Sequence, residues 1–123
     1  MERKCAVTHP KRGEVYLVCF DPTVGAEIRK TRPALIIQND IGNSHSRLTI
    51  VAAISSQFDN TLYPTEVLVQ PPEGGLREPS VVMLNQIRSV DKQRLVTKLG
   101  RLTPERMTLI DHALHISIGL VEL

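Results

Sequence analysis

The 123-residue chain has no tryptophan, and aromatic residues make up only 3% of it. Its core must therefore be built mainly from Val, Ile and Leu, within a hydrophobic content of 41%. No run approaches the ~20 apolar residues of a membrane span. The charged N-terminus lacks the apolar stretch of a signal peptide. We expect a polar arm over residues 1–10 and one globular domain over residues 11–123, with no membrane contact.

Cysteine is also scarce, with only Cys5 and Cys19 in the chain. Two cysteines without CxxC spacing are too few for a disulfide framework. We interpret both as reduced thiols, which favours a cytoplasmic protein. The chain contains no Walker A, GxGxxG or GxSxG pattern, so the commonest nucleotide-binding and serine-hydrolase signatures are excluded.

A metal site has little support in the sequence. His112 and His115 stand three residues apart beside Asp111, whereas zinc-binding helices favour histidines four residues apart. The remaining histidines, His9 and His45, fall in the arm and in a loop. We therefore expect no metal ion and no other cofactor.

Short apolar runs at close spacing predict several strands, which cover residues 14–20, 34–38, 48–54, 65–70, 80–84, 86–90 and 96–102. The polar segments 39–47 and 71–79 are predicted to be a loop and a turn region. A helix is predicted from Thr103-Pro104-Glu105 onward, because these residues suit a cap, a first-turn proline and an acidic first turn. Its apolar face would be Met107, Ile110, Leu114, Ile118 and Val121. The predicted fold is mainly β with a C-terminal helix, as a small barrel.

The basic residues are clustered although the net charge is only +2. They gather in residues 1–12, 27–32 and 86–101. If these regions share one face, that face is an electropositive surface for a phosphate backbone. The alternative is a solvated surface with scattered charge.

Arg32 stands out because Pro33 follows it. Proline drives the preceding residue into an extended conformation and belongs at the first residue of a strand or on an edge strand. Arg32 is therefore expected to be held rigidly at the mouth of a strand, where a guanidinium suits bidentate phosphate binding. The alternative is a simple salt bridge from Arg32 to Glu27 or Asp40.

A second polar cluster, Ser55-Ser56-Gln57, directly follows the central strand. A hydroxyl at a strand end is well placed to meet a ligand, but many strand ends carry one for local reasons. Asn39, Asn43 and Asp40 are expected to cap and brace their own loop.

An ordered set of motifs resembles the MazF/PemK-type toxins, which are ribosome-independent mRNA interferases of toxin–antitoxin pairs. The matching stretches are KRGEVY at 11–16, the segment from Arg32-Pro33 to IIQNDIGN at 36–43, VAAIS at 51–55 and QIRSVDKQRL at 86–95. The resemblance runs from residue 11 to about residue 121 and leaves out the arm.

This resemblance implies an SH3-like barrel, a homodimer, and metal-independent cleavage of single-stranded RNA at short sequences. The family's essential arginine before proline falls on Arg32, and its catalytic hydroxyl, usually a threonine, falls on Ser55. Serine keeps the hydroxyl but loses the methyl group that restrains χ1, so we expect activity with looser positioning. The expected partner is a MazE-like antitoxin whose disordered acidic segment covers the RNA groove.

Cleavage without a metal can use the 2′-hydroxyl of the RNA, leaving a 2′,3′-cyclic phosphate and a 5′-hydroxyl. Arg32 would stabilise charge on the phosphoryl oxygens, and Ser55 would donate a hydrogen bond to the same phosphate. Arginine is a poor general base, so the base is unassigned. His45 is a candidate for that role or an ordinary loop histidine. The expected RNA-binding residues are Glu27, Arg29, Lys30, Gln57, Gln86 and Arg88.

Two other functions compete with this hypothesis. One is a non-enzymatic toxin of the CcdB type, which poisons DNA gyrase on the same barrel. Its activity is associated with a C-terminal Trp-Gly-Ile, whereas this chain ends in Val121-Glu-Leu123. The other is a small RNA-binding barrel that carries out no chemistry.

Overall fold

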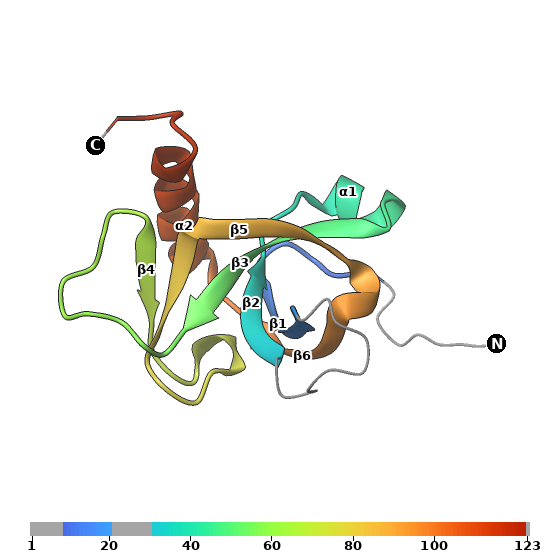
Figure 1. The fold of residues 1–123 in the computed structure, drawn as a ribbon, viewed down its shortest axis with the longest axis horizontal. Helices are drawn as coiled ribbons and strands as arrows, with labels where there is room; N and C mark the ends of the chain where they lie inside the picture. The colour runs from blue at the N-terminus through green and yellow to red at the C-terminus, as the bar shows by residue number, and fades with distance from the viewer. Residues whose placement is uncertain (1–8, 21–30, 123) are drawn as a thin grey trace.

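The computed structural model describes residues 9–20 and 31–122 (Figure 1). Six strands, two α-helices and two 3₁₀ turns follow one another along this part of the chain. The strands are β1 (Glu14–Cys19), β2 (Thr31–Ile36), β3 (Leu48–Ser55), β4 (Glu66–Val69), β5 (Ser80–Asp91) and β6 (Leu95–Arg101). The helices are α1 (Asp40–His45) and α2 (Pro104–Ser117), and the 3₁₀ turns are η2 (Glu73–Gly75) and η3 (Lys92–Arg94). The predicted mainly β fold with a C-terminal helix is confirmed.

All six strands form one antiparallel sheet in the order β4-β5-β3-β2-β1-β6. The strands β4 and β6 are its two edges and do not pair with each other. Instead η2, which follows β4, packs directly onto β6: a Cβ on Gly75 would lie 2.0 Å from the Leu99 carbonyl oxygen. The barrel-like shape is therefore completed by the packing of a turn and not by a further ladder of hydrogen bonds.

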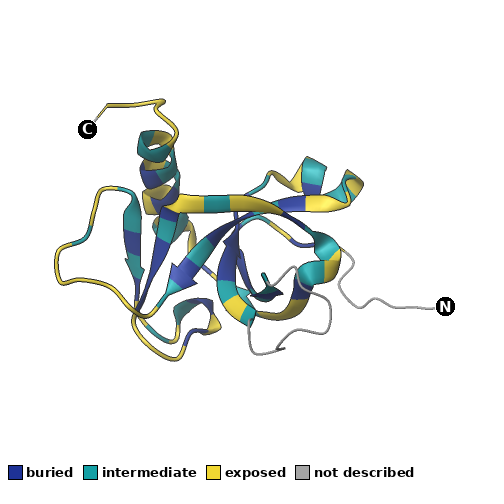
Figure 2. Cartoon of the chain, viewed as in Figure 1, coloured by how far each residue is buried: buried dark blue, intermediate teal, exposed yellow. Residues whose placement is uncertain are grey.

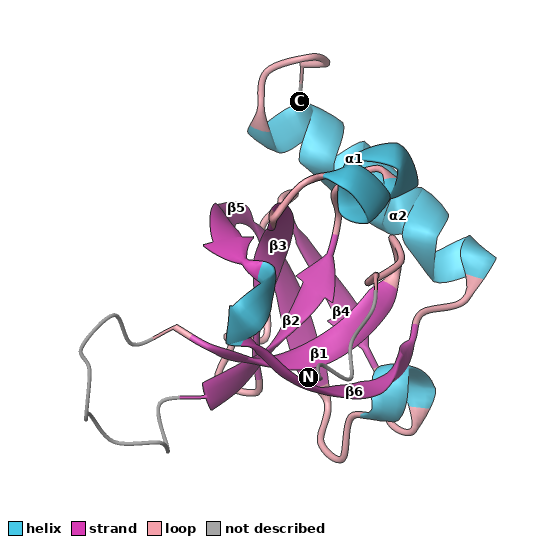
Figure 3. Ribbon diagram, turned by 90° about the vertical axis from the view of Figure 1, so that its right-hand side faces the viewer, coloured by secondary structure: helices cyan, strands magenta, loops and turns pink. Residues whose placement is uncertain are grey.

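Alternation along the strands produces two apolar clusters, one on each face of the sheet. Val15, Leu35 and Ala52 lie in the larger cluster, which also holds Ile110 and Ala113 of α2. Figure 3 shows α2 running along one side of the strands. The smaller cluster contains Tyr16, Val18, Ala34, Ile36, Val51, Val90 and Leu95. Figure 2 shows the buried positions concentrated on the strands, with exposed positions on the loops and the C-terminal tail.

The start of α2 follows the prediction. The Thr103 hydroxyl accepts from the Arg106 backbone N–H at 3.1 Å, and Pro104 occupies the first turn. The predicted apolar face is correct for Met107, Ile110 and Leu114, which contact or enter the core.

The end of the predicted apolar face is wrong for the last two residues. The helix ends at Ser117, and Gly119 then turns the chain with a φ of 82°. Ile118 and Val121 are consequently 52% and 39% exposed.

The segment predicted as a loop over 39–47 contains the short helix α1. Asn39 caps it by accepting from the Gly42 backbone N–H at 2.7 Å. Asn43 is fully buried, and its side chain accepts from the Thr49 hydroxyl at 2.7 Å. The helix depends on these contacts with β3, since its own sequence carries no apolar periodicity.

The two strands predicted over 80–84 and 86–90 are one continuous strand, β5. Its pairing with β3 is irregular: Ala52 lies opposite Ile87, whereas the next residue, Ala53, lies opposite Met83. The extra residues include Asn85 and Gln86, which are exposed. The polar pair marks an irregularity within a strand and not the predicted break between two strands.

Candidate functional site

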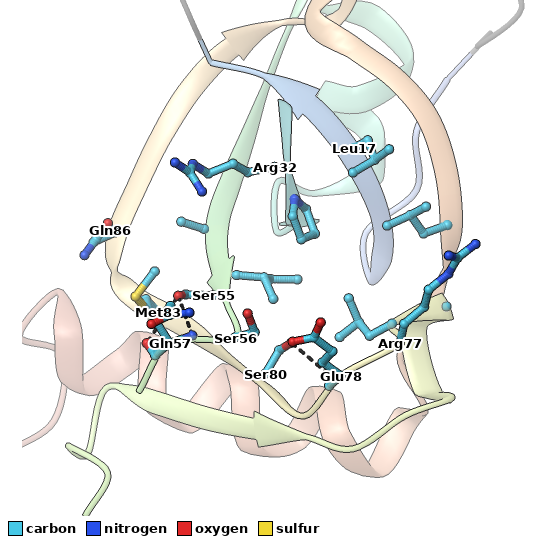
Figure 4. Close-up of a pocket in the computed structure, with 16 residues that line it drawn as sticks. Leu17, Arg32, Ser55, Ser56, Gln57, Arg77, Glu78, Ser80, Met83 and Gln86 are labelled. Carbon is cyan, nitrogen blue, oxygen red and sulfur yellow. Dashed lines mark hydrogen bonds between the residues drawn. The ribbon is translucent and has the colours of Figure 1, made fainter. Parts of the chain in front are cut away.

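One cavity of about 640 Å³ gathers the polar clusters that the sequence singles out (Figure 4). Its apolar floor comes from strands on both sides of β2 and from η2. It is lined by Leu17, Arg32, Pro33, Ala53, Ile54, Ser55, Ser56, Gln57, Gly75, Leu76, Arg77, Glu78, Ser80, Met83, Gln86 and Leu99. Arg32, Ser55, Gln57 and Gln86 are thus brought together as predicted site residues.

Pro33 sits at the third position of β2, an interior strand, and not at a strand start or on an edge strand as expected. The Ile36 carbonyl accepts from Gly13 on the β1 side, whereas the Ile37 N–H donates towards β3. Backbone alternation therefore turns Pro33 towards β3. Pairing with β3 begins only at Ala34, so the missing N–H of proline interrupts no ladder bond.

The Arg32 side chain is exposed at the rim of this cavity, and no described residue forms an ion pair with it. Asp40, one alternative partner, is engaged elsewhere: its carboxylate accepts from the Arg12 backbone N–H at 2.7 Å. That hydrogen bond is the main reason why the pKa of Asp40 is lowered. The other alternative, Glu27, lies outside the described residues.

Ser55 ends β3 with its side chain in a local turn. Its Oγ accepts from the Gln57 backbone N–H at 3.0 Å and donates to the Gln57 carbonyl at 3.2 Å. The first bond fixes the oxygen atom in place. The bond to the carbonyl is long for an O–H donor, so it holds the hydroxyl proton only weakly.

Arg88, another predicted RNA-binding residue, does not line this cavity. Its guanidinium lies 5.1 Å from the centre of the Phe20 ring, a cation–π contact. The three other predicted RNA-binding residues, Glu27, Arg29 and Lys30, lie outside the described residues.

His45 is far from the cavity. It ends α1 and precedes β3, whereas Ser55 closes the other end of β3. A strand of eight residues at about 3.3 Å each separates the two by roughly 20 Å or more. Within one chain, His45 therefore cannot act as the general base for a phosphate bound at Ser55.

Several cations of the region 86–101 are engaged locally. Lys98 forms an ion pair with the buried Glu14 at 2.9 Å, and Lys92 donates to the Asn43 carbonyl. Burial, followed by the charge of Glu14 and its hydrogen bond, raises the pKa of Tyr16 to about 12. These contacts stabilise the barrel, so this region contributes less free positive charge than its composition suggests.

Two charged residues between η2 and β5, Arg77 and Glu78, line the cavity although no sequence pattern predicts them there. The segment 71–79 carries only a turn signal, and the fold alone brings it beside β2 and β3. Ser56 and Ser80 also line the cavity; Ser56 is exposed, whereas Ser80 is buried.

Within residues 9–20 and 31–122, no group of three or more His, Cys, Asp and Glu side chains is arranged to hold a metal ion. Across the same residues, no helix has the length and apolar character needed to span a bilayer.

A family model, a related sequence and solved structures all match this chain and agree with one another. The family described as "PemK-like, MazF-like toxin of type II toxin-antitoxin system" matches residues 11–118. Endoribonuclease EndoA of Bacillus subtilis (strain 168) is 46% identical over 112 residues, which cover 91% of this chain and 97% of that protein. A mycobacterial endoribonuclease structure has a TM-score of 0.75 at 27% identity, over 94% of this chain and 96% of that one. A mycobacterial endoribonuclease in complex with its cognate antitoxin has a TM-score of 0.73 at 27% identity, over 93% of this chain and 99% of that one.

Proposed function

Because this chain belongs to the PemK-like, MazF-like family of type II toxin–antitoxin toxins, we propose that it cuts single-stranded RNA in the cavity lined by Arg32 and Ser55. The protein is an endoribonuclease toxin. The main support for this site is that Arg32 and Ser55 line the same cavity. In addition, no described residue forms an ion pair with Arg32.

The proposed reaction begins with attack of a ribose 2′-oxygen on the adjacent phosphorus. The new P–O2′ bond forms as the P–O5′ bond breaks. The products are a 2′,3′-cyclic phosphate and a 5′-hydroxyl. One proton leaves the 2′-hydroxyl and another reaches the departing 5′-oxygen. DNA lacks the nucleophile, so the selectivity for RNA comes from the substrate itself.

Arg32 supplies fixed N–H donors for the charge that builds up on the phosphoryl oxygens. Pro33 keeps the backbone of Arg32 extended, which limits the cost of orienting the guanidinium. Ser55 adds a second donor. Its hydroxyl proton can turn from the Gln57 carbonyl to a phosphoryl oxygen while the Gln57 N–H still holds the oxygen atom. Among the described residues that line the cavity, Glu78 alone carries a carboxylate, and no histidine is present, so Glu78 is the proposed general base.

Base recognition is assigned to the two glutamines of the cavity. Gln57 and Gln86 each present both a donor and an acceptor, which suits the edges of unpaired bases. The apolar floor, which includes Pro33, offers a surface against which a base can lie. No cofactor is required for this scheme.

We further propose that the toxin is a homodimer that acts in the cytoplasm. Exposed apolar side chains near the end of the chain and in the loop before β4 support this proposal: Tyr63, Ile118, Leu120 and Val121 are exposed at 63%, 52%, 66% and 39%. Tyr63 and Val121 line a common cavity of about 670 Å³ at the end of α2. A second copy of the chain would cover this surface. The proposed antitoxin is a MazE-like protein whose acidic segment occupies the RNA groove and meets Arg32.

The test is cleavage of a long single-stranded RNA in the presence of EDTA. The expected result is a set of short-sequence cuts with 2′,3′-cyclic phosphate ends. Arg32→Ala should lower kcat by about 100-fold or more, since it removes the main charge-stabilising donor. Arg47→Ala is the matched control, because Arg47 is 81% exposed at the far end of β3. RNA that stays intact yet binds tightly would point instead to a barrel without chemistry, and full activity in Arg32→Ala would remove the site assignment.

A further inference from the structure

The turn between η2 and β5 brings two charged residues to the cavity rim, across from Arg32 (Figure 4). Arg77 and Glu78 are exposed, whereas Leu76 before them and Ser80 after them are buried at 7% and 5% exposure. Because the flanking side chains point into the protein, the backbone between them is forced outward. The path of the backbone therefore places Arg77 at the rim, whichever rotamer its side chain adopts.

Hydrogen bonds hold the turn at both ends. The Glu73 carboxylate accepts from the Thr103 backbone N–H at 3.0 Å and from Arg106 at 3.2 Å. Burial alone would raise the pKa of Glu73, but these bonds and the Arg106 charge hold it below its usual value. At the other end, the Ser80 hydroxyl donates to the Glu78 carbonyl at 2.9 Å. A ligand that binds Arg77 therefore pays only a small entropic cost for ordering the backbone of this turn.

Arg77 is available to such a ligand. The ion pairs within the described residues join Arg12 to Asp111, Arg47 to Asp91, Lys98 to Glu14 and Arg106 to Glu73. In that part of the chain none involves Arg77, and the neighbouring Glu78 carboxylate does not pair with it. An exposed guanidinium on the rim is suited to a phosphate, which it can bind through two parallel N–H donors.

We propose that Arg77 binds a phosphate of the RNA other than the one that is cut. Arg32 and Arg77 line the same cavity from opposite sides, so a strand whose scissile phosphate lies at Arg32 crosses the rim at Arg77. Arg77 would then hold the strand in register and contribute to substrate binding, with no part in the bond-breaking step. This inference rests on the proposed function.

The experiment compares the wild type with Arg77→Gln on two RNA substrates. One carries several nucleotides on each side of the cut, and the other is a minimal substrate without flanking phosphates. On the long substrate Arg77→Gln should raise KM about tenfold, the effect of losing a charge-assisted hydrogen bond, with kcat within about twofold. The steepness of log KM against log salt should fall by about 0.7. On the minimal substrate the two proteins should agree.

Two further variants sharpen the test. Arg77→Lys keeps the positive charge but lacks the paired N–H donors of the guanidinium. Its KM should therefore lie between those of the wild type and Arg77→Gln. Arg47→Gln removes an equal charge far from the cavity and should leave KM unchanged. A wild-type KM in Arg77→Gln on the long substrate overturns the inference. So does an equal rise in Arg47→Gln, or an equal rise on both substrates.

Binding to a DNA copy of the long substrate separates this inference from the proposed function. DNA keeps every phosphate but lacks the 2′-hydroxyl, so it reports on Arg77 without any cleavage. Weaker DNA binding by Arg77→Gln than by Arg47→Gln supports the inference even if no RNA is cut. Equal DNA binding by the two variants contradicts it even if the wild type cuts RNA.

Discussion

A single oxygen atom, Oγ of Ser55, is held by the backbone N–H of Gln57 at 3.0 Å. This bond restrains χ1 by a different route from the methyl group of a threonine. The sequence alone predicts looser positioning, because it shows only the missing methyl. The structure supplies a restraint that depends on the turn after β3.

Ser55→Ala should lower kcat by about 100-fold, because it removes one donor to the phosphoryl oxygens. Ser55→Thr should stay within about threefold of the wild type, since both the hydroxyl and the Gln57 contact are retained. Single-turnover cleavage of a defined RNA measures both variants, and thermal melting checks that they are folded. A fully active Ser55→Ala would show that the hydroxyl has no part in the reaction.

Some charged residues of the site can be predicted from the sequence, and others cannot. Arg32 can be found because proline after arginine is a local signal, readable without the fold. Arg77 gives no such signal, since its position at the cavity depends on how η2 packs against β6. The place of Arg88 outside the cavity is equally hidden from the sequence, because its contact with Phe20 joins residues far apart in the chain.

At the scale of elements, η2 connects the two ends of the sheet. Gly75 has a φ of 74°, and a Cβ there would lie 2.0 Å from the Leu99 carbonyl oxygen. Gly119 has a similar φ of 82°, but a Cβ at that residue would meet no described atom within 4 Å. The two glycines share a positive φ and differ in how closely their surroundings are packed.

Replacing each glycine with alanine should therefore destabilise the protein to different extents, and Gly119 serves as the control for Gly75. Gly119→Ala should cost only the backbone strain, about 1 kcal/mol of unfolding free energy. Gly75→Ala adds a clash with the β6 backbone and should cost about 3 kcal/mol or more. Urea unfolding of both variants measures the difference. Equal losses would mean that η2 is not packed tightly against β6.

The strands are predictable because their apolar runs are local signals, and α2 is predictable because Thr103 and Pro104 mark its start. Helix α1 is not, because it depends on the Asn39 cap and on the buried Asn43 and not on its own pattern. The single strand β5 is predicted as two strands, 80–84 and 86–90, because the polar Asn85 interrupts the apolar run. Only the pairing with β3 shows that the strand continues through this residue.

At the scale of the whole molecule, the exposed apolar surface at the end of α2 gives a prediction about assembly. Val121→Glu places a charge on this surface and should weaken self-association by about tenfold or more. Leu109→Glu is the control, since Leu109 lies within α2 and is 51% exposed but lines a different cavity. Sedimentation velocity over a range of protein concentrations measures both. Equal association of the Val121 variant and the wild type would place the dimer contact elsewhere.

The pairing of β1 with β6 joins the first strand of the sheet to the last. The cavity is likewise lined from Leu17 to Leu99, so most of the chain must be present before it is complete. A copy still emerging from a ribosome lacks the strand that covers β1, and its cavity has no finished wall. We therefore expect this endoribonuclease to lack a complete site until almost the whole chain has been synthesised.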